Sequence, residues 1–282
     1  MRYKGEQGRG PSQARDEHTI YLDCSTGVSG DMLLAALVGA HDDLHGPGTG
    51  AAFLEEELAR LGIDGFELGW SEVLVGGMNT RRVDVIQTRE QPLRRHADLV
   101  HIIESSGLSG RAAERSVKAV TLLGQAEAKV HGTTLDAIHF HEIGAVDTIV
   151  DIAGAMLLLD ALGAIAVCCS PVDLGSGFVH CAHGTMPVPA PACAELAKGL
   201  VAFGSACGME RATPTGLAIL RTVADSCGSM PLGTTLAVGY GSGGRSSDEQ
   251  PTYVRAFVIQ PVAVAPHIEG RHQACGGHRE RE

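Results

Sequence analysis

The 282-residue sequence is poor in aromatic side chains and has no cluster of basic residues. Phe, Trp and Tyr make up only 4% of the chain, whereas Gly occurs 37 times, a composition that suits helices packed on sheets with many tight turns. The formal net charge is −11, and a nucleic-acid-binding protein normally presents a basic face. We therefore expect a protein that handles cations or small molecules and has no nucleic-acid partner.

The sequence also lacks a membrane-spanning segment and a cysteine framework. No apolar run approaches the roughly 20 residues that cross a bilayer, and the longest candidate, residues 143–162, contains three aspartates. The polar N-terminus has no apolar core of the kind found in signal peptides. None of the eight cysteines forms a C-x-x-C pair, and a strand would point Cys168 and Cys169 to opposite faces. These absences predict a cytoplasmic protein with reduced thiols and no membrane partner.

Extended and helical patterns alternate along the chain. We expect a disordered leader at 1–18, one domain at 19–260 and a flexible tail at 261–282. Within the domain, the pattern predicts strands at 19–24, 233–243 and 251–260, a hairpin at 66–88 that turns at Gly76–Gly77, and helices at 96–107 and 110–132. This order predicts an α/β fold, with α+β as the alternative, in which several helices flank a mixed sheet.

Residues 138–154, IHFHEIGAVDTIVDIAG, place metal-capable groups beside residues that favour burial. If the start of this segment is extended, His139 and His141 point to the same side, where two imidazoles can chelate one metal ion. Glu142 follows them directly. From about residue 145 the pattern predicts a helix that is apolar on almost every face, which is typical of a buried helix.

The free-energy cost of burying a charged carboxylate differs between two aspartates of that helix. Asp147 and Asp151 are four residues apart and share one face. Asp147 lies in the first turn, where the helix dipole favours a negative charge, whereas Asp151 is one turn deeper and is costly unless it is paired or bound to a cation. The alternative is that the histidines are ordinary residues and the aspartates pair with Arg or Lys. The spacing alone leaves both interpretations open.

Two further segments resemble the anion-binding starts of helices. In DCSTGVSGDM, residues 23–32, the pattern predicts a strand, a loop of small residues and a helix that is capped by Ser29 and begins near Gly30. In TPTG, residues 213–216, Thr213 caps a second helix and Pro214 occupies its first position. Free N–H groups at such starts bind phosphate or carboxylate, although both segments also fit ordinary turns.

The segment HCAHGTMPVPAPA, residues 180–192, is a third candidate site. His180, Cys181 and His183 could bind a metal ion in a loop stiffened by prolines. The alternative is a proline-rich loop with incidental histidines.

Taken together, these motifs resemble the nickel insertion protein family LarC. The resemblance rests on YLDCSTGVSGDML, IHFHEIGAVDTIVD, CAHGTMPVPAPA and TPTGLAIL, which occur in the family's order between about residues 19 and 258. It implies insertion of nickel into pyridinium-3,5-bisthiocarboxylic acid mononucleotide, with formation of nickel–carbon and nickel–sulfur bonds. The product is the nickel-pincer cofactor of lactate racemase, which makes the family a cyclometallase of the lyase class. The resemblance also implies that the lactate racemase maturation proteins are partners of this chain.

By position, the resemblance carries over thirteen residues to this sequence, and we infer their division into three groups from their chemistry. The metal-binding group is His139, His141, Glu142 and Asp147. The catalytic group is Asp151 and His183. The group expected to bind the pincer nucleotide precursor is Asp23, Ser29, Gly30, Asp31, Thr213, Thr215 and Gly216.

The chain departs from the family's pattern in three ways. Ser25 stands where the family usually carries Phe, the histidine-rich insert of many members is absent, and members continue into a second domain associated with CTP and manganese. The resemblance therefore implies CTP and manganese only through a separate C-terminal LarC-like subunit or domain, without which the chain could be inactive. A nickel-delivery module and a metal-dependent hydrolase of a phosphorylated small molecule stay open as alternatives, and imidazole and thiol ligands also suit zinc and cobalt.

Overall fold

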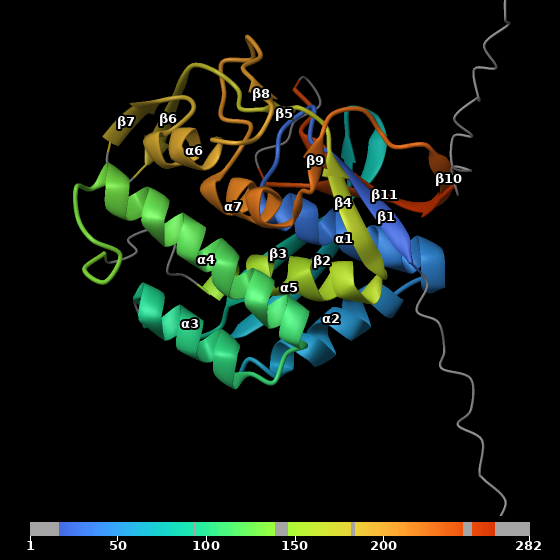
Figure 1. The fold of residues 1–282 in the computed structure, drawn as a ribbon, viewed down its shortest axis with the longest axis horizontal. Helices are drawn as coiled ribbons and strands as arrows, with labels where there is room; N and C mark the ends of the chain where they lie inside the picture. Colours follow the sequence, from blue (N-terminus) through green and yellow to red (C-terminus); the bar gives the residue numbers. More distant parts are fainter. Residues whose placement is uncertain (1–16, 93, 139–145, 182–183, 245–249, 263–282) are drawn as a thin grey trace, which may run out of the picture.

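The computed structural model describes residues 17–92, 94–138, 146–181, 184–244 and 250–262 (Figure 1). Within these ranges, the helices are α1 (Gly30–His45), α2 (Thr49–Ala59), α3 (His96–Ser105), α4 (Gly110–Val130), α5 (Val146–Ala161), α6 (Pro191–Leu196) and α7 (Pro214–Val223). The strands are β1 (His18–Asp23), β2 (Phe66–Val75), β3 (Met78–Gln87), β4 (Ala164–Cys169), β5 (Val172–Asp173), β6 (Phe178–Cys181), β7 (Gly184–Pro187), β8 (Ala202–Phe203), β9 (Ser226–Cys227), β10 (Gly233–Ser242) and β11 (Tyr253–Pro261).

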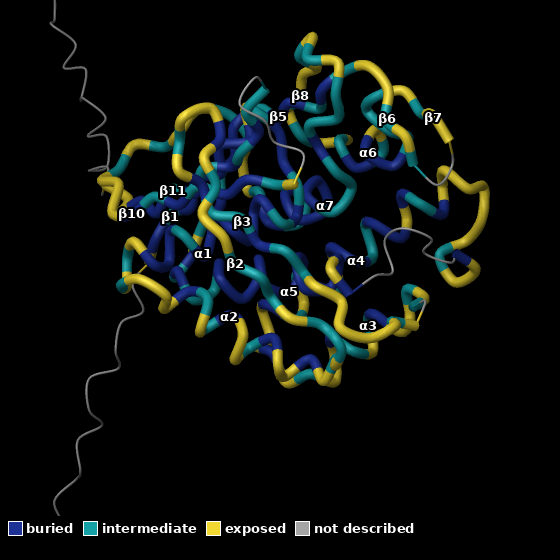
Figure 2. The backbone as a smooth tube through the Cα atoms, turned by 180° about the vertical axis from the view of Figure 1, so that it is seen from behind, coloured by how far each residue is buried: buried dark blue, intermediate teal, exposed yellow. Residues whose placement is uncertain are grey.

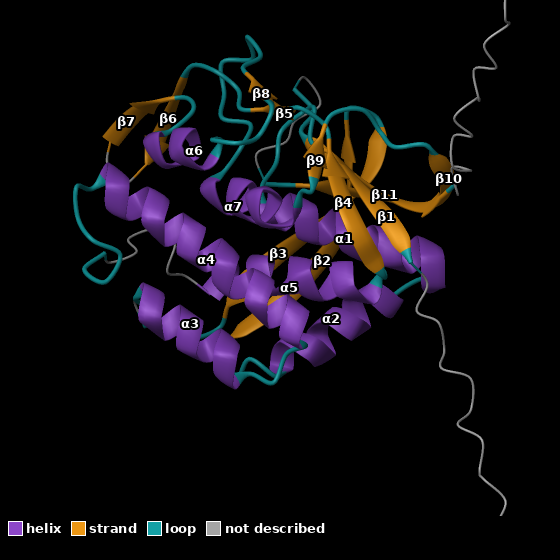
Figure 3. Cartoon of the chain, in the orientation of Figure 1, coloured by secondary structure: helices purple, strands orange, loops and turns teal. Residues whose placement is uncertain are grey.

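A mixed sheet of seven strands, in the order β2-β3-β10-β11-β1-β4-β9, forms the centre of the fold. β1 lies between β11, to which it is antiparallel, and β4, to which it is parallel. Strands from the amino-terminal and carboxyl-terminal parts of the chain are therefore neighbours in the sheet. The helices gather to one side of β1, β4 and β11 (Figure 3). This arrangement confirms the α/β prediction.

Helix α1 lies between the sheet and α5 and is buried along most of its length (Figure 2). Its contact with β10 is backbone against backbone, because a Cβ on Gly239 would overlap the carbonyl oxygen of Ala36, and one on Gly241 would overlap that of Met32. On the opposite side, a Cβ on Gly154 of α5 would lie 2.6 Å from Cδ1 of Leu34. The start of α1 is thus held in position by close contacts on both sides.

Several local predictions are confirmed. The hairpin of β2 and β3 turns at Gly76 and Gly77, whose positive φ values of 57° and 78° suit a tight hairpin turn. Helices α3 and α4 are followed by Gly107 and Gly132, which also have positive φ. No helix among the described residues is both long and apolar enough to cross a membrane.

Helix α1 extends further than the sequence pattern predicted. The sequence DDLHGPGTG, residues 42–50, breaks the helical pattern and predicts an end before Asp42, but α1 continues to His45. The buried Asp42 carboxylate accepts hydrogen bonds from the backbone N–H of Gly50, at 2.7 Å, and from Arg81, at 2.6 Å. These contacts compensate the charge of Asp42 and allow the acidic turn to remain helical. Two small strand pairs, β5–β8 and β6–β7, were also not predicted.

Candidate functional site

The helix starts at Ser29 and Thr213, far apart in the sequence, lie side by side. The backbone N–H of Val28 donates to the carbonyl oxygen of Arg211, at 2.8 Å, and the N–H of Thr213 donates to that of Val28, at 2.9 Å. A Cβ on Gly216 would lie 2.8 Å from Cα of Ser29. Gly216 therefore permits the first turns of α1 and α7 to pack closely.

A pocket of about 260 Å³ opens where these two helices begin. It is lined by Ser29, Asp31, Met32, Met209, Glu210, Arg211, Thr213, Gly243, Gly244 and Thr252. Three of these lining residues, Ser29, Asp31 and Thr213, had been predicted from two separate sequence motifs. Gly30, Thr215 and Gly216 belong to the same helix starts but do not line the pocket.

The two predicted helix caps differ. The Thr213 hydroxyl accepts a hydrogen bond from the backbone N–H of Gly216, at 3.4 Å, and Pro214 occupies the first turn, as predicted. Ser29 occupies the cap position of α1, but its hydroxyl donates to the Asp31 carboxylate and does not cap the backbone. Ser29 is therefore part of a side-chain contact inside the pocket.

Asp31 is one of two acidic residues that line the pocket, beside Glu210, and it is the one that the sequence motif indicates. Its carboxylate also accepts from the backbone N–H of Met32, at 2.9 Å. Burial raises the pKa of Asp31, and this effect outweighs the hydrogen bonds from Ser29 and Met32 and the nearby charge of Arg82. The environment thus disfavours a negative charge on this carboxyl group.

Asp151 lies directly behind the start of α1. A Cβ on Gly30 would overlap Oδ2 of Asp151 and lie 2.8 Å from its Cβ, so Gly30 makes room for this carboxyl group. The Asp151 residue is only 8% exposed, and its Oδ1 has no hydrogen-bond partner among the described residues. Burial raises the pKa of Asp151 well above its ordinary value, and the charges of Asp31 and Asp147 add to this effect.

The environment of Asp151 bears on the alternative that the aspartates pair with Arg or Lys. Within the described chain, no ion pair involves Asp151. Asp147 is exposed in the first turn of α5, where it accepts from the backbone N–H of Thr148 at 2.7 Å, as expected for a first-turn carboxylate. Asp151 is the carboxyl group that conventional pairing does not explain.

Four predicted residues, His139, His141, Glu142 and His183, lie outside the described residues. Their roles as metal ligands or catalytic groups stay predictions. In the part of the chain that the structure describes, no three His, Cys, Asp or Glu side chains are grouped so that they could hold a metal ion.

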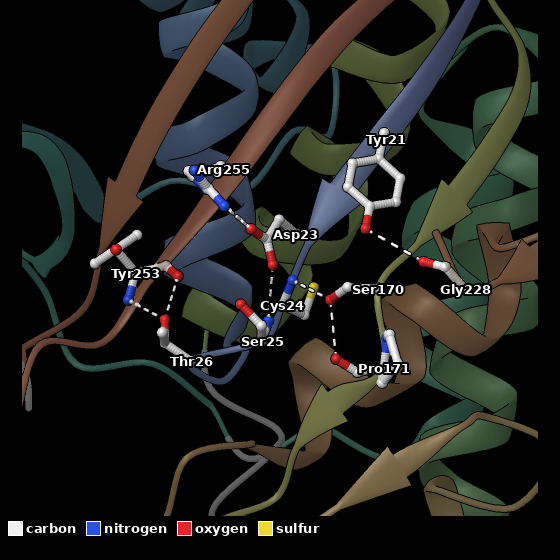
Figure 4. Close-up of polar contacts among 10 residues, drawn as sticks. All are labelled: Tyr21, Asp23, Cys24, Ser25, Thr26, Ser170, Pro171, Gly228, Tyr253 and Arg255. Atoms are coloured by element: carbon white, nitrogen blue, oxygen red, sulfur yellow. Dashed lines mark hydrogen bonds and ion pairs between the residues drawn. The ribbon is translucent and has the colours of Figure 1, made fainter. Parts of the chain in front are cut away.

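Asp23 has a different environment from the one expected. It does not line the pocket and instead pairs with Arg255, whose Nε lies 2.9 Å from Oδ2 of Asp23, while Oδ1 accepts from the backbone N–H of Ser25 at 3.0 Å (Figure 4). Burial raises the pKa of Asp23, but the hydrogen bonds from Ser25 and Arg255 outweigh it and the net shift is downward. Asp23 therefore anchors the loop between β1 and α1.

The same loop is fixed at two further points (Figure 4). The backbone N–H of Cys24 donates to the Ser170 hydroxyl at 2.8 Å, and the Thr26 hydroxyl donates to the carbonyl oxygen of Tyr253 at 2.8 Å. These contacts attach the loop to the residue that follows β4 and to β11, so the start of α1 has a defined position relative to the sheet.

The motif analysis missed several pocket residues, among them Arg211, Gly243 and Gly244. Arg211 stands only two residues before Thr213, but nothing in its neighbours distinguishes it from an ordinary surface arginine. The two glycines belong to a Gly-rich run, GYGSGG, that follows a predicted strand. That run lacks the following helix of a dinucleotide-binding motif and was therefore not assigned to a site.

Comparison with protein families shows a match to the nickel insertion protein family over residues 20–279. The chain belongs to this family. A relative from Desulfotalea psychrophila is 43% identical over 245 residues, which cover 86% of this chain and 61% of the relative. The family resemblance inferred from the four motifs is thereby confirmed.

Two further relatives of the nickel insertion family are named pyridinium-3,5-bisthiocarboxylic acid mononucleotide nickel insertion protein. The one from Geobacillus kaustophilus is 35% identical over 255 residues, covering 87% of this chain and 60% of the relative. The one from Desulfitobacterium hafniense is 43% identical over 223 residues, which cover 79% of this chain and 54% of the relative. The chain spans about three fifths of the length of the first relatives it matches. No solved structure matches it.

Proposed function

We propose that this chain takes part in the insertion of nickel into pyridinium-3,5-bisthiocarboxylic acid mononucleotide. The observation that carries the proposal is the pocket in which two family motifs, at Ser29–Asp31 and at Thr213, meet beside the unpaired carboxyl group of Asp151. Family membership and the names of two relatives supply the reaction. Nickel is a substrate of this reaction, and the nucleotide is the acceptor.

The residues divide between the two substrates under this proposal. His139, His141, Glu142 and Asp147 hold nickel, and His183 assists its transfer. The pocket receives the anionic nucleotide, because N–H groups at helix starts favour negatively charged ligands. Gly30, Thr215 and Gly216 contribute by shaping those helix starts, and Asp23 contributes by anchoring the loop that precedes one of them.

Asp151 has the chemistry of a proton acceptor. Formation of a nickel–carbon bond replaces a carbon–hydrogen bond, so one proton must leave the pyridinium ring. A carboxylate with a raised pKa is a stronger base than an ordinary one. Asp151, with its raised pKa, and Asp31, which lines the pocket in front of it, are suited to receive that proton.

We further propose that CTP and manganese act through a separate C-terminal LarC-like subunit, and that the product serves lactate racemase. The decisive assay combines the purified chain with nickel and the precursor, with and without CTP, manganese and the C-terminal region of a relative. Mass spectrometry detects the metallated nucleotide, and activation of lactate racemase confirms it. The controls are the double variant His139→Ala/His141→Ala and the single variant Asp151→Asn, each of which should lower product formation by at least about tenfold.

The outcomes of this assay separate the functions that the sequence left open. Metallated nucleotide in any of these mixtures supports the proposal, and its absence from all of them contradicts it. Nickel binding without transfer would instead identify a delivery module. Release of phosphate without metallation would identify a hydrolase.

A further inference from the structure

Arg211 differs from other arginines near it in having no carboxylate partner within the described residues. Its Nη1 donates to the carbonyl oxygens of Pro251, at 2.8 Å, and Thr26, at 3.4 Å, and to the Thr252 hydroxyl. All three acceptors are neutral. Arg255, by contrast, pairs with Asp23.

The side chain of Arg211 is also incompletely satisfied. Its Nε is buried and has no hydrogen-bond partner among the described residues. A buried donor left unpaired on a charged group is costly, and the cost is removed when an acceptor reaches it. Arg211 also lines the pocket, so its positive charge acts on a ligand there even though Nε itself is closed to solvent.

The positive charge of Arg211 already acts on a neighbouring group. Burial raises the pKa of the Cys207 thiol, but hydrogen bonds from Ser205 and Arg211 and the charge of Arg211 outweigh this and lower the pKa to about 7. The guanidinium therefore stabilises a negative charge on Cys207, two residues before the pocket residue Met209. Within the pocket, the carboxyl groups of Asp31 and Glu210 oppose this positive charge, and burial raises the pKa of Asp31.

We propose that Arg211 binds the phosphate group of a mononucleotide in the pocket between α1 and α7. At the start of α1, where Asp31 lines the pocket, the helix dipole adds to the positive potential of Arg211. Guanidinium groups form strong, charge-assisted hydrogen bonds to phosphate, and their planar fork can hold two of its oxygens. The identity of the ligand rests on the proposed function, whereas the binding of a phosphate monoester does not. The pyridinium ring then extends from Arg211 toward Asp31, which lines the same pocket.

The test uses three probes without nickel: inorganic phosphate, nicotinic acid mononucleotide and nicotinic acid riboside, which lacks the phosphate. Dissociation constants are measured by calorimetry for the wild type and for Arg211→Met. We expect the variant to bind phosphate and the mononucleotide at least about tenfold more weakly, and the riboside as the wild type does. The control is Arg221→Met, in the last turn of α7, which should match the wild type.

Arg211 also joins two loops, so Arg211→Met could fail to fold. Two other variants keep the proposal testable. Arg211→Lys retains the charge without the planar fork, and we expect about threefold weaker binding of the mononucleotide. Glu210→Gln removes a carboxylate from the pocket wall, and we expect phosphate to bind about threefold more tightly.

Unchanged affinity for the mononucleotide in a folded Arg211→Met or Arg211→Lys variant overturns the proposal, as does unchanged phosphate affinity in Glu210→Gln. The same variants distinguish this proposal from that of nickel insertion. Phosphate binding that depends on Arg211, in a chain that never inserts nickel, supports the phosphate site and contradicts the proposed function. If the chain inserts nickel but its phosphate binding does not depend on Arg211, the proposed function is supported and the phosphate site is contradicted.

Discussion

Asp151 shows at the scale of one residue how burial changes a carboxyl group. Its folded-state pKa is raised above the ordinary value of a carboxyl group, so the folded protein is most stable, with respect to this group, below that ordinary value. Stability is then lost as pH rises toward the raised pKa. Asp151→Asn removes the ionisation and should raise the free energy of unfolding of the metal-free protein by about 1–3 kcal/mol at pH 8, with little effect at pH 4.

Denaturant unfolding at both pH values checks this prediction. Asp147→Asn is the matched control, because Asp147 is exposed one turn earlier on the same helix. Destabilisation by Asp151→Asn at pH 8 would show instead that the ionised carboxylate has a stabilising partner.

Cys207 is expected to be the most reactive of the described cysteines near neutral pH. With a pKa of about 7, about half of its thiol is ionised at pH 7, and the thiolate is the nucleophile. Its alkylation rate should therefore reach half of its maximum near pH 7. Ser205→Ala removes the hydrogen bond that lowers the pKa of Cys207 most, and should therefore move that midpoint to higher pH. Mass spectrometry of iodoacetamide-treated protein measures the rate, and the buried Cys24, whose pKa is raised by burial, is the internal control.

Single-residue patterns identified one side of the pocket but not the other. Ser29, Asp31 and Thr213 belong to local motifs, because a helix start is encoded by a few neighbouring residues. Arg211 depends on acceptors from Thr26 and Pro251, which only the folded chain brings to it. No local pattern contains that information.

At the scale of elements, the contact between α1 and β10 depends on glycines. Gly241→Ala would place a methyl group on the backbone of α1 at Met32, where no flexible side chain can move away. We expect a loss of about 3 kcal/mol or more in the free energy of unfolding, together with weaker binding of phosphate, because the start of α1 shifts. Denaturant unfolding and calorimetry measure the two effects.

Gly110→Ala is the control for this substitution. Gly110 begins α4, and an added Cβ there has no atom within 4 Å. The change should leave phosphate binding unaltered and stabilise the protein by up to about 1 kcal/mol. Equal stability of the Gly241→Ala and Gly110→Ala variants would contradict the close contact.

The elements differ in how much of them the sequence predicts. The hairpin turn at Gly76–Gly77 and the ends of α3 and α4 were predicted, because glycines with positive φ act locally. The pairing of β1 with β11 and β4 was not predicted, because it joins segments more than a hundred residues apart. The extension of α1 to His45 was missed because it depends on a contact with Arg81, which lies on β3.

At the scale of the whole molecule, neither half of the chain contains a complete sheet. β1 pairs with β4 and β11, and β3 pairs with β10, so each of these pairings joins the two halves. Fragments 1–141 and 142–282 should each unfold without a cooperative transition, whereas an equimolar mixture should recover one. Circular dichroism during denaturant titration tests this. A cooperative transition of fragment 1–141 alone would show that the first half has its own core.

The origin of the pocket walls has a consequence for protein synthesis. The walls come from residues 29–32, 209–213 and 243–252, and the loop before α1 is attached to Arg255. Since the ribosome releases the amino end first, the first wall emerges long before the last. A nascent chain therefore cannot complete this pocket until the residues up to Thr252 have left the exit tunnel. The order of the strands along the chain therefore sets the earliest point in synthesis at which the pocket can bind any ligand.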